Sequence, residues 1–127
     1  MNILILIFVG GGIGSIARYA LMQAISRYIT PGSAFPWHTL GVNVLGAFLI
    51  GLLIEILALR IAMPAPPRFL LVTGFLGGFT TFSAFSMETA LMLERGDYLN
   101  SSLYILASVA FTVAAVFMGI ASVRIFS

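Results

Sequence analysis

Four long apolar stretches dominate the sequence and leave little chain between them. They cover residues 3–25, 37–59, 69–93 and 99–123. A helix needs about 20 apolar residues to cross the hydrocarbon core of a bilayer, and each stretch reaches that length. We therefore predict an all-α membrane protein in which residues 1–127 form a single integral membrane domain with four transmembrane helices.

The composition agrees with that prediction and excludes most soluble classes. Of the 127 residues, 61% are hydrophobic and 8% are charged, and the mean hydropathy is +1.13, whereas a soluble domain carries about 25% charged residues. Lysine and cysteine are absent and His38 is the only histidine, which removes Schiff-base lysines, cysteine nucleophiles and zinc clusters. We therefore expect no enzymatic activity. The net charge of +2 is too small to indicate nucleic acid binding.

The arginines are distributed almost evenly between the two ends of the predicted helices. With a cytoplasmic N-terminus, three lie inside and two lie outside, namely Arg60, Arg68 and Arg124 against Arg27 and Arg95. Arg18 joins the outer group if its side chain reaches the interface. Orientation normally follows an excess of Lys and Arg on the cytoplasmic side, and this chain has almost none. Charge alone leaves two interpretations, a weak bias corrected by other signals or insertion in both directions.

Glycine and polar residues inside the first two stretches are the first candidate features. Gly10 and Gly14 form a small-residue pair, which indicates close helix packing rather than a nucleotide loop, because no strand–turn–helix unit surrounds it. Arg18 either reaches the interface or faces a wet cavity, where it would form a positive vestibule that concentrates anions. Asn43 either bonds a neighbouring helix or offers its NH2 group to a passing anion.

The third stretch contains the run GFLGGFTTFSAFSMET over residues 74–89. Paired glycines followed by paired threonines are poor helix formers, so we predict a break in the helix near residues 77–81. Broken backbone is tolerated at membrane depth only where protein or a water-lined cavity satisfies it. The carbonyl oxygens freed by such a break suit a hard cation such as sodium.

Aromatic and polar side chains follow the predicted break. Phe82 and Phe85 lie three residues apart on one helical face, where they either pack against a neighbour or turn their electropositive ring edges toward an anion path. Ser83 and Glu88 add polarity that a lipid-facing helix would not keep.

In the last stretch, three hydroxyl side chains recur at intervals of four and form one stripe, Tyr104, Ser108 and Thr112. Their hydroxyl groups have two interpretations. They either bond carbonyl groups one turn earlier in the helix or form a ladder of neutral donors that replaces an anion's hydration.

These features together resemble the Fluc family of small fluoride channels over essentially the whole chain. The resemblance rests on the run GGGIGSIAR that ends in Arg18, the run NVLG that begins at Asn43, the run TGFLGGFTTFSAFSMET and the polar last stretch. It implies a homodimer of two antiparallel subunits with dual topology in the inner membrane, with two pores that export fluoride. Such a dimer would explain the even distribution of arginine.

The resemblance also implies roles for individual residues. A structural sodium ion would lie on the two-fold axis of the dimer, held by backbone carbonyl groups of Gly77 and Thr80. Arg18 would lie in a vestibule. The fluoride path would be lined by Asn43, Phe82, Ser83, Phe85, Glu88, Tyr104, Ser108 and Thr112.

The main alternative is a proton-coupled exporter of the small multidrug type. Such an exporter needs a carboxylate at mid-membrane, typically in the first span. Here the first span holds Arg18 and no acid, and Glu88 lies late in the third. A subunit that only assembles with others would leave the polar stripe and the broken helix unexplained.

Overall fold

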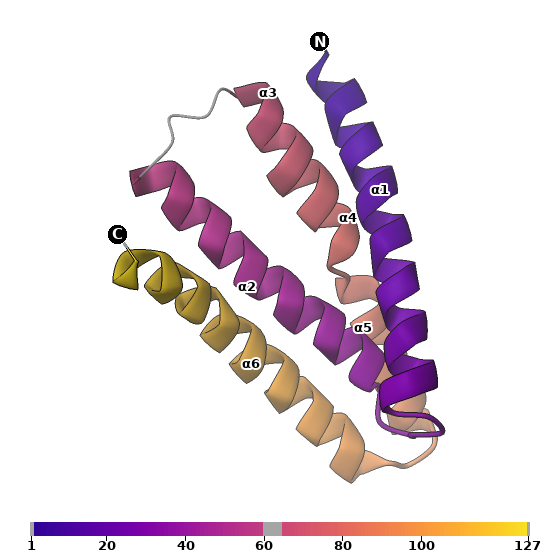
Figure 1. Cartoon of the computed structure of the whole chain (residues 1–127). Coiled ribbons are helices and arrows are strands. Elements are labelled where there is room, and N and C mark those ends of the chain that lie inside the picture. The colour runs from indigo at the N-terminus through magenta and orange to yellow at the C-terminus, as the bar shows by residue number, and fades with distance from the viewer. Residues whose placement is uncertain (1, 60–64, 127) are drawn as a thin grey trace.

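The computed structural model describes residues 2–59 and 65–126, which form four long helices (Figure 1). The first is α1 (Ile3–Ala24) with the π-helical turn η1 (Ile25–Ile29), the second is α2 (Trp37–Leu59) and the fourth is α6 (Tyr98–Ile125). The third consists of α3 (Ala65–Arg68), the π-helical η2 (Phe69–Leu76), α4 (Gly77–Phe79) and α5 (Phe82–Glu94). All four are long and apolar enough to cross a membrane, so the predicted all-helical fold with four spans is confirmed.

The third helix begins earlier than the sequence predicts. Residues 60–68 contain three prolines, which disfavour the interior of a helix, yet α3 begins at Ala65 and includes Pro66 and Pro67. A proline in the first turn of a helix costs no hydrogen bond, because the first N–H groups have no partner there. Arg60 and Pro64 lie outside the described residues.

The helices pack in two close pairs that rely on glycine. A β-carbon on Gly14 would collide with the Phe75 carbonyl at the end of η2, and one on Gly119 of α6 would collide with the Phe48 carbonyl of α2. Gly10 and Gly14 are both buried. The predicted packing role of these two glycines is therefore confirmed, and it places α1 directly against the third helix.

A tight turn joins the third and fourth helices. Gly96 has a φ of 77°, a left-handed conformation that glycine adopts without strain. The Asp97 carboxylate then accepts a hydrogen bond from the Asn100 N–H at 3.3 Å and caps α6. This turn places α5 beside α6, and a small core of Leu40, Met92 and Tyr104 fills the space between α2, α5 and α6.

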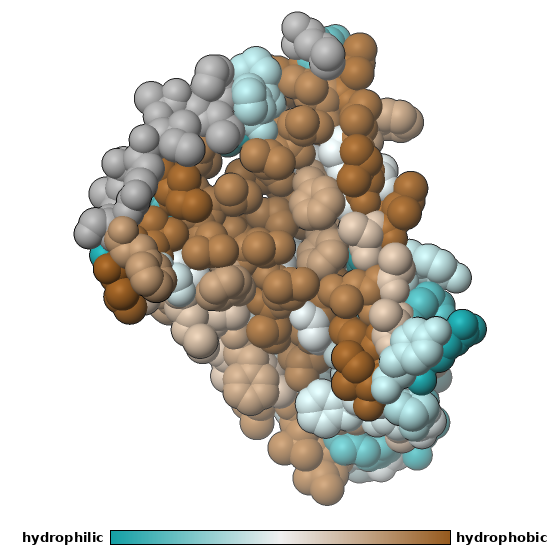
Figure 2. Space-filling view, viewed as in Figure 1, coloured by the Kyte–Doolittle hydropathy of each residue, from teal (hydrophilic) through white to brown (hydrophobic). Residues whose placement is uncertain are grey.

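Most of the visible surface is apolar, and polar side chains gather at one end (Figure 2). Large apolar side chains such as Phe8, Ile16 and Phe117 are well exposed on the outer faces of the helices. An exposed surface of this kind suits lipid rather than water. The chain is a multi-pass membrane protein.

One ion pair joins α2 to α6 near the end of the helices that holds the C-terminus. The Arg124 Nε lies 2.8 Å from Glu55 Oε1. The Glu55 side chain is buried while that of Arg124 is largely exposed. Because a buried carboxylate needs a partner, this pair explains how an acid can lie inside an apolar helix pair.

Candidate functional site

The third helix is broken at Thr80 and Thr81, inside the predicted region. Thr80 (φ −85°, ψ 155°) and Thr81 (φ −147°, ψ 118°) are extended, and α5 begins at the next residue. Gly77 remains helical, with φ −62° and ψ −38°. The break therefore begins at the two β-branched threonines, which fit an extended backbone well, and not at the paired glycines.

Asn43 on α2 satisfies the broken backbone. Its Nδ2 donates to the Thr81 carbonyl at 3.0 Å, and its Oδ1 accepts from the Thr81 N–H at 2.8 Å. Thr81 also caps α5, because its Oγ1 accepts a hydrogen bond from the Ala84 N–H at 3.2 Å. Of the two interpretations of Asn43, the bond to a neighbouring helix is observed, and the second amide hydrogen remains for another acceptor.

The break also changes the partners of the carbonyl groups that precede it. In a continuous helix the Thr81 N–H would donate to the Gly77 carbonyl four residues earlier, but here it donates to Asn43. Thr80 donates both its N–H and its Oγ1 to the Leu76 carbonyl, each at 3.0 Å. The Gly77 carbonyl thus loses its regular helical donor at the carboxyl end of a helical segment, where partial negative charge gathers.

An open groove of about 440 Å³ lies beside the break, between α2, the third helix and α6. Its lining includes five residues of the predicted anion path and both predicted sodium ligands: Asn43, Phe82, Phe85, Ser108, Thr112, Gly77 and Thr80. Aliphatic side chains such as Ile50, Val72 and Val116 form most of the remaining wall. Three separate parts of the sequence therefore meet in one groove.

A line of aromatic rings leads from this groove into the core. The Phe82 and Phe85 rings have centroids 5.4 Å apart, and the Phe85 and Tyr104 rings have centroids 5.0 Å apart. Phe82 is 78% exposed in the single chain, whereas Tyr104 is fully buried. Tyr104 does not line the groove but lies behind Phe85.

The hydroxyl groups of Tyr104, Ser108 and Thr112 on α6 differ in whether they have a hydrogen-bond partner. Thr112 Oγ1 donates to the Ser108 carbonyl one turn earlier at 2.5 Å, which is the backbone-bonding interpretation of the stripe. Tyr104 Oη and Ser108 Oγ are buried and have no hydrogen-bond partner within the described part of the chain. Buried hydroxyls normally find partners, so the Ser108 hydroxyl, which lines the groove, is available to a ligand there.

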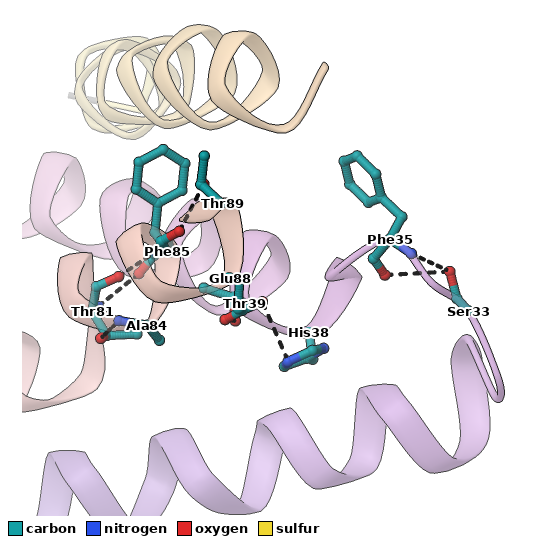
Figure 3. A network of polar contacts seen from close by, with 10 residues as sticks. Ser33, Phe35, His38, Thr39, Thr81, Ala84, Phe85, Glu88 and Thr89 are labelled. Atoms are coloured by element: carbon teal, nitrogen blue, oxygen red, sulfur yellow. Dashed lines mark hydrogen bonds and ion pairs between the residues drawn. The ribbon is translucent and has the colours of Figure 1, made fainter. Parts of the chain in front are cut away.

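Glu88 belongs to a separate polar cluster, shown in Figure 3. Thr39 Oγ1 donates to Glu88 Oε1 at 2.5 Å, and His38 Nε2 lies 3.7 Å from Glu88 Oε2. The sequence reasoning missed Thr39 as a polar partner and assigned no role to His38. In the sequence, His38 and Thr39 are two adjacent polar residues in the first turn of a span. That pattern alone does not indicate a site, because the residues that face them on the opposing helix are not known from the sequence.

Besides Tyr104, which lies behind Phe85, two other predicted site residues lie outside both the groove and this cluster. Arg18 is a partly buried residue of α1 that does not line the groove. Ser83 is exposed on α5, and its Oγ lies 3.2 Å from Thr81 Oγ1. Within a single chain, the groove therefore contains neither the predicted vestibule arginine nor this serine.

The broken span, the open groove with its few polar groups and the apolar exterior define a membrane protein with a polar break inside one span, and comparison with known proteins identifies its family. The family described as CrcB-like protein, Camphor Resistance (CrcB) matches residues 5–120. The chain is 49% identical over 120 residues to the fluoride-specific ion channel FluC of Rhizobium johnstonii, with 94% of each chain covered. It is 47% identical over 124 residues to the protein of that name from Geobacter sulfurreducens, with 98% of each covered. The chain belongs to the CrcB-like family, which confirms the resemblance seen in the sequence.

Proposed function

We propose that this protein is a fluoride-selective channel that lets fluoride leave the cytoplasm passively and so limits its toxicity. Relatives that carry the name of fluoride-specific ion channel are 47–49% identical over nearly the whole chain. The structural observation that carries the proposal is the buried, unpartnered hydroxyl of Ser108 in the phenylalanine-lined groove, with the buried Tyr104 hydroxyl behind Phe85. Each buried polar group left unsatisfied costs about 1–3 kcal/mol, and a bound anion would recover this energy.

The groups around the groove suit an anion that must move and not stay bound. Ser108 Oγ and the second amide hydrogen of Asn43 are neutral donors, and the edges of Phe82 and Phe85 are weakly electropositive. Such groups replace part of the hydration of a small anion, and no cation of the groove lining holds it in place.

We propose that a second copy of the chain in the opposite orientation closes the groove. The groove is open along one side in a single chain, and Phe82 is 78% exposed there. An ion path through lipid must be enclosed by protein, because lipid cannot hydrate an ion. The even distribution of arginine supports insertion in both directions.

We further propose that sodium binds at the break as a structural ion. The ligands that we propose for this ion are backbone carbonyl oxygens at the break. The Gly77 carbonyl lacks its regular helical donor, and Gly77 and Thr80 both line the groove. Two carbonyls from each of two subunits would give four oxygen ligands, which suits a small hard cation. Bound sodium would hold the two breaks together.

Fluoride efflux from liposomes that contain the purified protein tests the main proposal. Vesicles loaded with potassium fluoride should release fluoride when a potassium ionophore removes the charge imbalance, with equal pH on both sides. Vesicles loaded with potassium chloride should release little chloride. Absence of fluoride release, or release only when a proton gradient is present, would contradict the proposal.

The Glu88→Gln variant separates the channel from the proton-coupled exporter. A channel does not need this carboxylate to carry protons, so passive fluoride release should persist in the variant. An exporter driven by Glu88 would stop. Drug-dependent proton movement in the unmodified protein would favour the exporter.

A further inference from the structure

We propose that His38 sets the charge at one end of the ion path, so that fluoride passes faster when His38 is protonated. The inference rests on the proposed channel function. It begins from a second hollow of about 200 Å³ between the start of α2 and the end of α5. His38, Glu88 and Arg95 are its charged or titratable lining residues, and Ser33 and Phe35 form part of its rim.

The two oxygens of Glu88 differ in their surroundings. Oε1 accepts the hydrogen bond of Thr39, whereas Oε2 is buried and has no hydrogen-bond partner among the described residues. His38 Nε2 lies 3.7 Å from this second oxygen (Figure 3). That separation is too long for a hydrogen bond but places an imidazolium charge directly beside the carboxylate. A proton on His38 therefore neutralises the pair.

The pair lies between water and the proposed path. The His38 side chain is 33% exposed and that of Glu88 is 16% exposed, so His38 is the group that exchanges protons with the hollow. On the inner side, the Tyr104 hydroxyl lies near Glu88 and Thr39, and the Tyr104 ring packs against Phe85. An uncompensated negative charge on Glu88 would therefore repel an anion that approaches the buried hydroxyls.

Apart from His38 and Glu88, the charged or titratable residues that line the three hollows are arginines and tyrosines. Arginine stays protonated and tyrosine stays neutral in this range, which covers Arg95 in the hollow and Tyr104 on α6. The elements η2 and α4 carry no charged side chain. On α1 and η1, three such residues line a different hollow, namely Tyr19, Arg27 and Tyr28. Arg18 lines none of the three hollows.

The sign of the effect follows from the charges. When His38 is protonated, its positive charge offsets the negative charge of an ionised Glu88, so the pair presents no net charge to fluoride. When His38 is neutral, the negative charge of an ionised Glu88 is left uncompensated within the pair. Histidine is the side chain that normally changes charge between about pH 5 and 8. Fluoride flux should therefore rise as the pH falls through this range.

Liposome efflux at equal internal and external pH, measured in steps from about pH 5.5 to 8, tests this inference. Equal pH makes the result independent of how the subunits are oriented, and protein-free liposomes correct for hydrogen fluoride that crosses lipid. We expect the unmodified protein to lose flux about fivefold to tenfold across the range. His38→Arg should keep the high flux at every pH, and His38→Gln should keep the low flux at every pH.

Histidine-selective NMR supplies a measurement that does not depend on a variant. His38 is the only histidine, so the imidazole signal needs no assignment, and its titration midpoint should coincide with the midpoint of the flux response. Two separate midpoints, or the same pH profile in the unmodified protein and both variants, would overturn the role of His38 and leave the channel function intact. No fluoride flux at any pH would overturn both.

Discussion

Asn43 and Thr81 are joined by two hydrogen bonds, so a side-chain amide on α2 replaces the backbone partners that the broken third helix has lost. The two bonds have the donor and acceptor arrangement of a strand pair. They fix the position of the break relative to α2, and with it the positions of Phe82 and the Gly77 carbonyl. The groove therefore depends on one side chain that does not belong to the broken helix.

Asn43→Ala should destabilise the folded protein by about 2 kcal/mol, because two hydrogen bonds of about 1 kcal/mol each are lost. Fluoride flux should fall as well, since the break loses its fixed position. Asn100→Ala is the matched control, because that amide bonds only Asp97 at the turn between α5 and α6, and it should cost less than about 1 kcal/mol. Denaturant unfolding in detergent measures both values. Equal losses of stability in the two variants would show that the Asn43 bonds contribute no more to folding than the Asn100 bond does.

The glycines of α1 allow a second test with an internal control. A β-carbon on Gly14 would meet the Phe75 carbonyl, whereas one on Gly12 would have no neighbour within 4 Å. Gly14→Ala should therefore destabilise the protein by about 1–3 kcal/mol, the usual cost of overpacking. Gly12→Ala should be neutral or stabilise it by up to about 1 kcal/mol through helix propensity. If thermal unfolding ranks the two variants in the opposite order, α1 does not pack on the third helix in this way.

The sequence predicts those parts of the fold that depend on local properties. Apolar length alone is sufficient to predict four spans, because the bilayer thickness sets a fixed minimum. The paired glycines and threonines predict a break near residues 77–81, because both residue types disfavour a helix, and the structure places the break at the threonines. Gly10 and Gly14 predict close packing, because small residues four positions apart let two helices approach closely.

Contacts between distant residues could not be predicted in the same way. Thr39 meets Glu88 and Arg124 meets Glu55 across different helices, and each contact depends on the register between two helices. In apolar helices with weakly amphipathic faces, periodicity does not define that register. The hydroxyl stripe of α6 illustrates the same point, because its spacing is regular while its three members have different surroundings.

Phe82 and Phe85 should both be required for fluoride flux but should differ in their effect on stability. Replacement by Ile keeps apolar bulk and removes the electropositive ring edge. We expect each variant to reduce flux at least about tenfold, because the ring edges contribute to the path. Phe85 packs against Tyr104 and Phe82 is exposed, so only Phe85→Ile should also lower the unfolding temperature. Normal flux in both variants would show that the two rings serve packing alone.

Removal of sodium should weaken the dimer. A ligand that binds only the assembled state stabilises it by about 2.7 kcal/mol at 100 times its dissociation constant. The dimer melting temperature in detergent should therefore be higher in sodium than in potassium at equal ionic strength. Thr80→Val is the matched variant, because it keeps the backbone carbonyl and removes only the Oγ1 bond to Leu76. It should keep the sodium response. Identical melting in the two salts would contradict a structural sodium ion.

Dual topology predicts that the orientation of the chain can be changed by small changes in charge. Two lysines added between the second and third spans should fix one orientation, and two lysines added to residues 30–36 should fix the other, because cytoplasmic loops retain positive charge. Each altered chain alone should lose most fluoride flux, since the proposed pathway needs both orientations. Expression of the two together should restore it. A C-terminal reporter on the unmodified chain should be found on both sides of the membrane, and its presence on one side alone would exclude the antiparallel dimer.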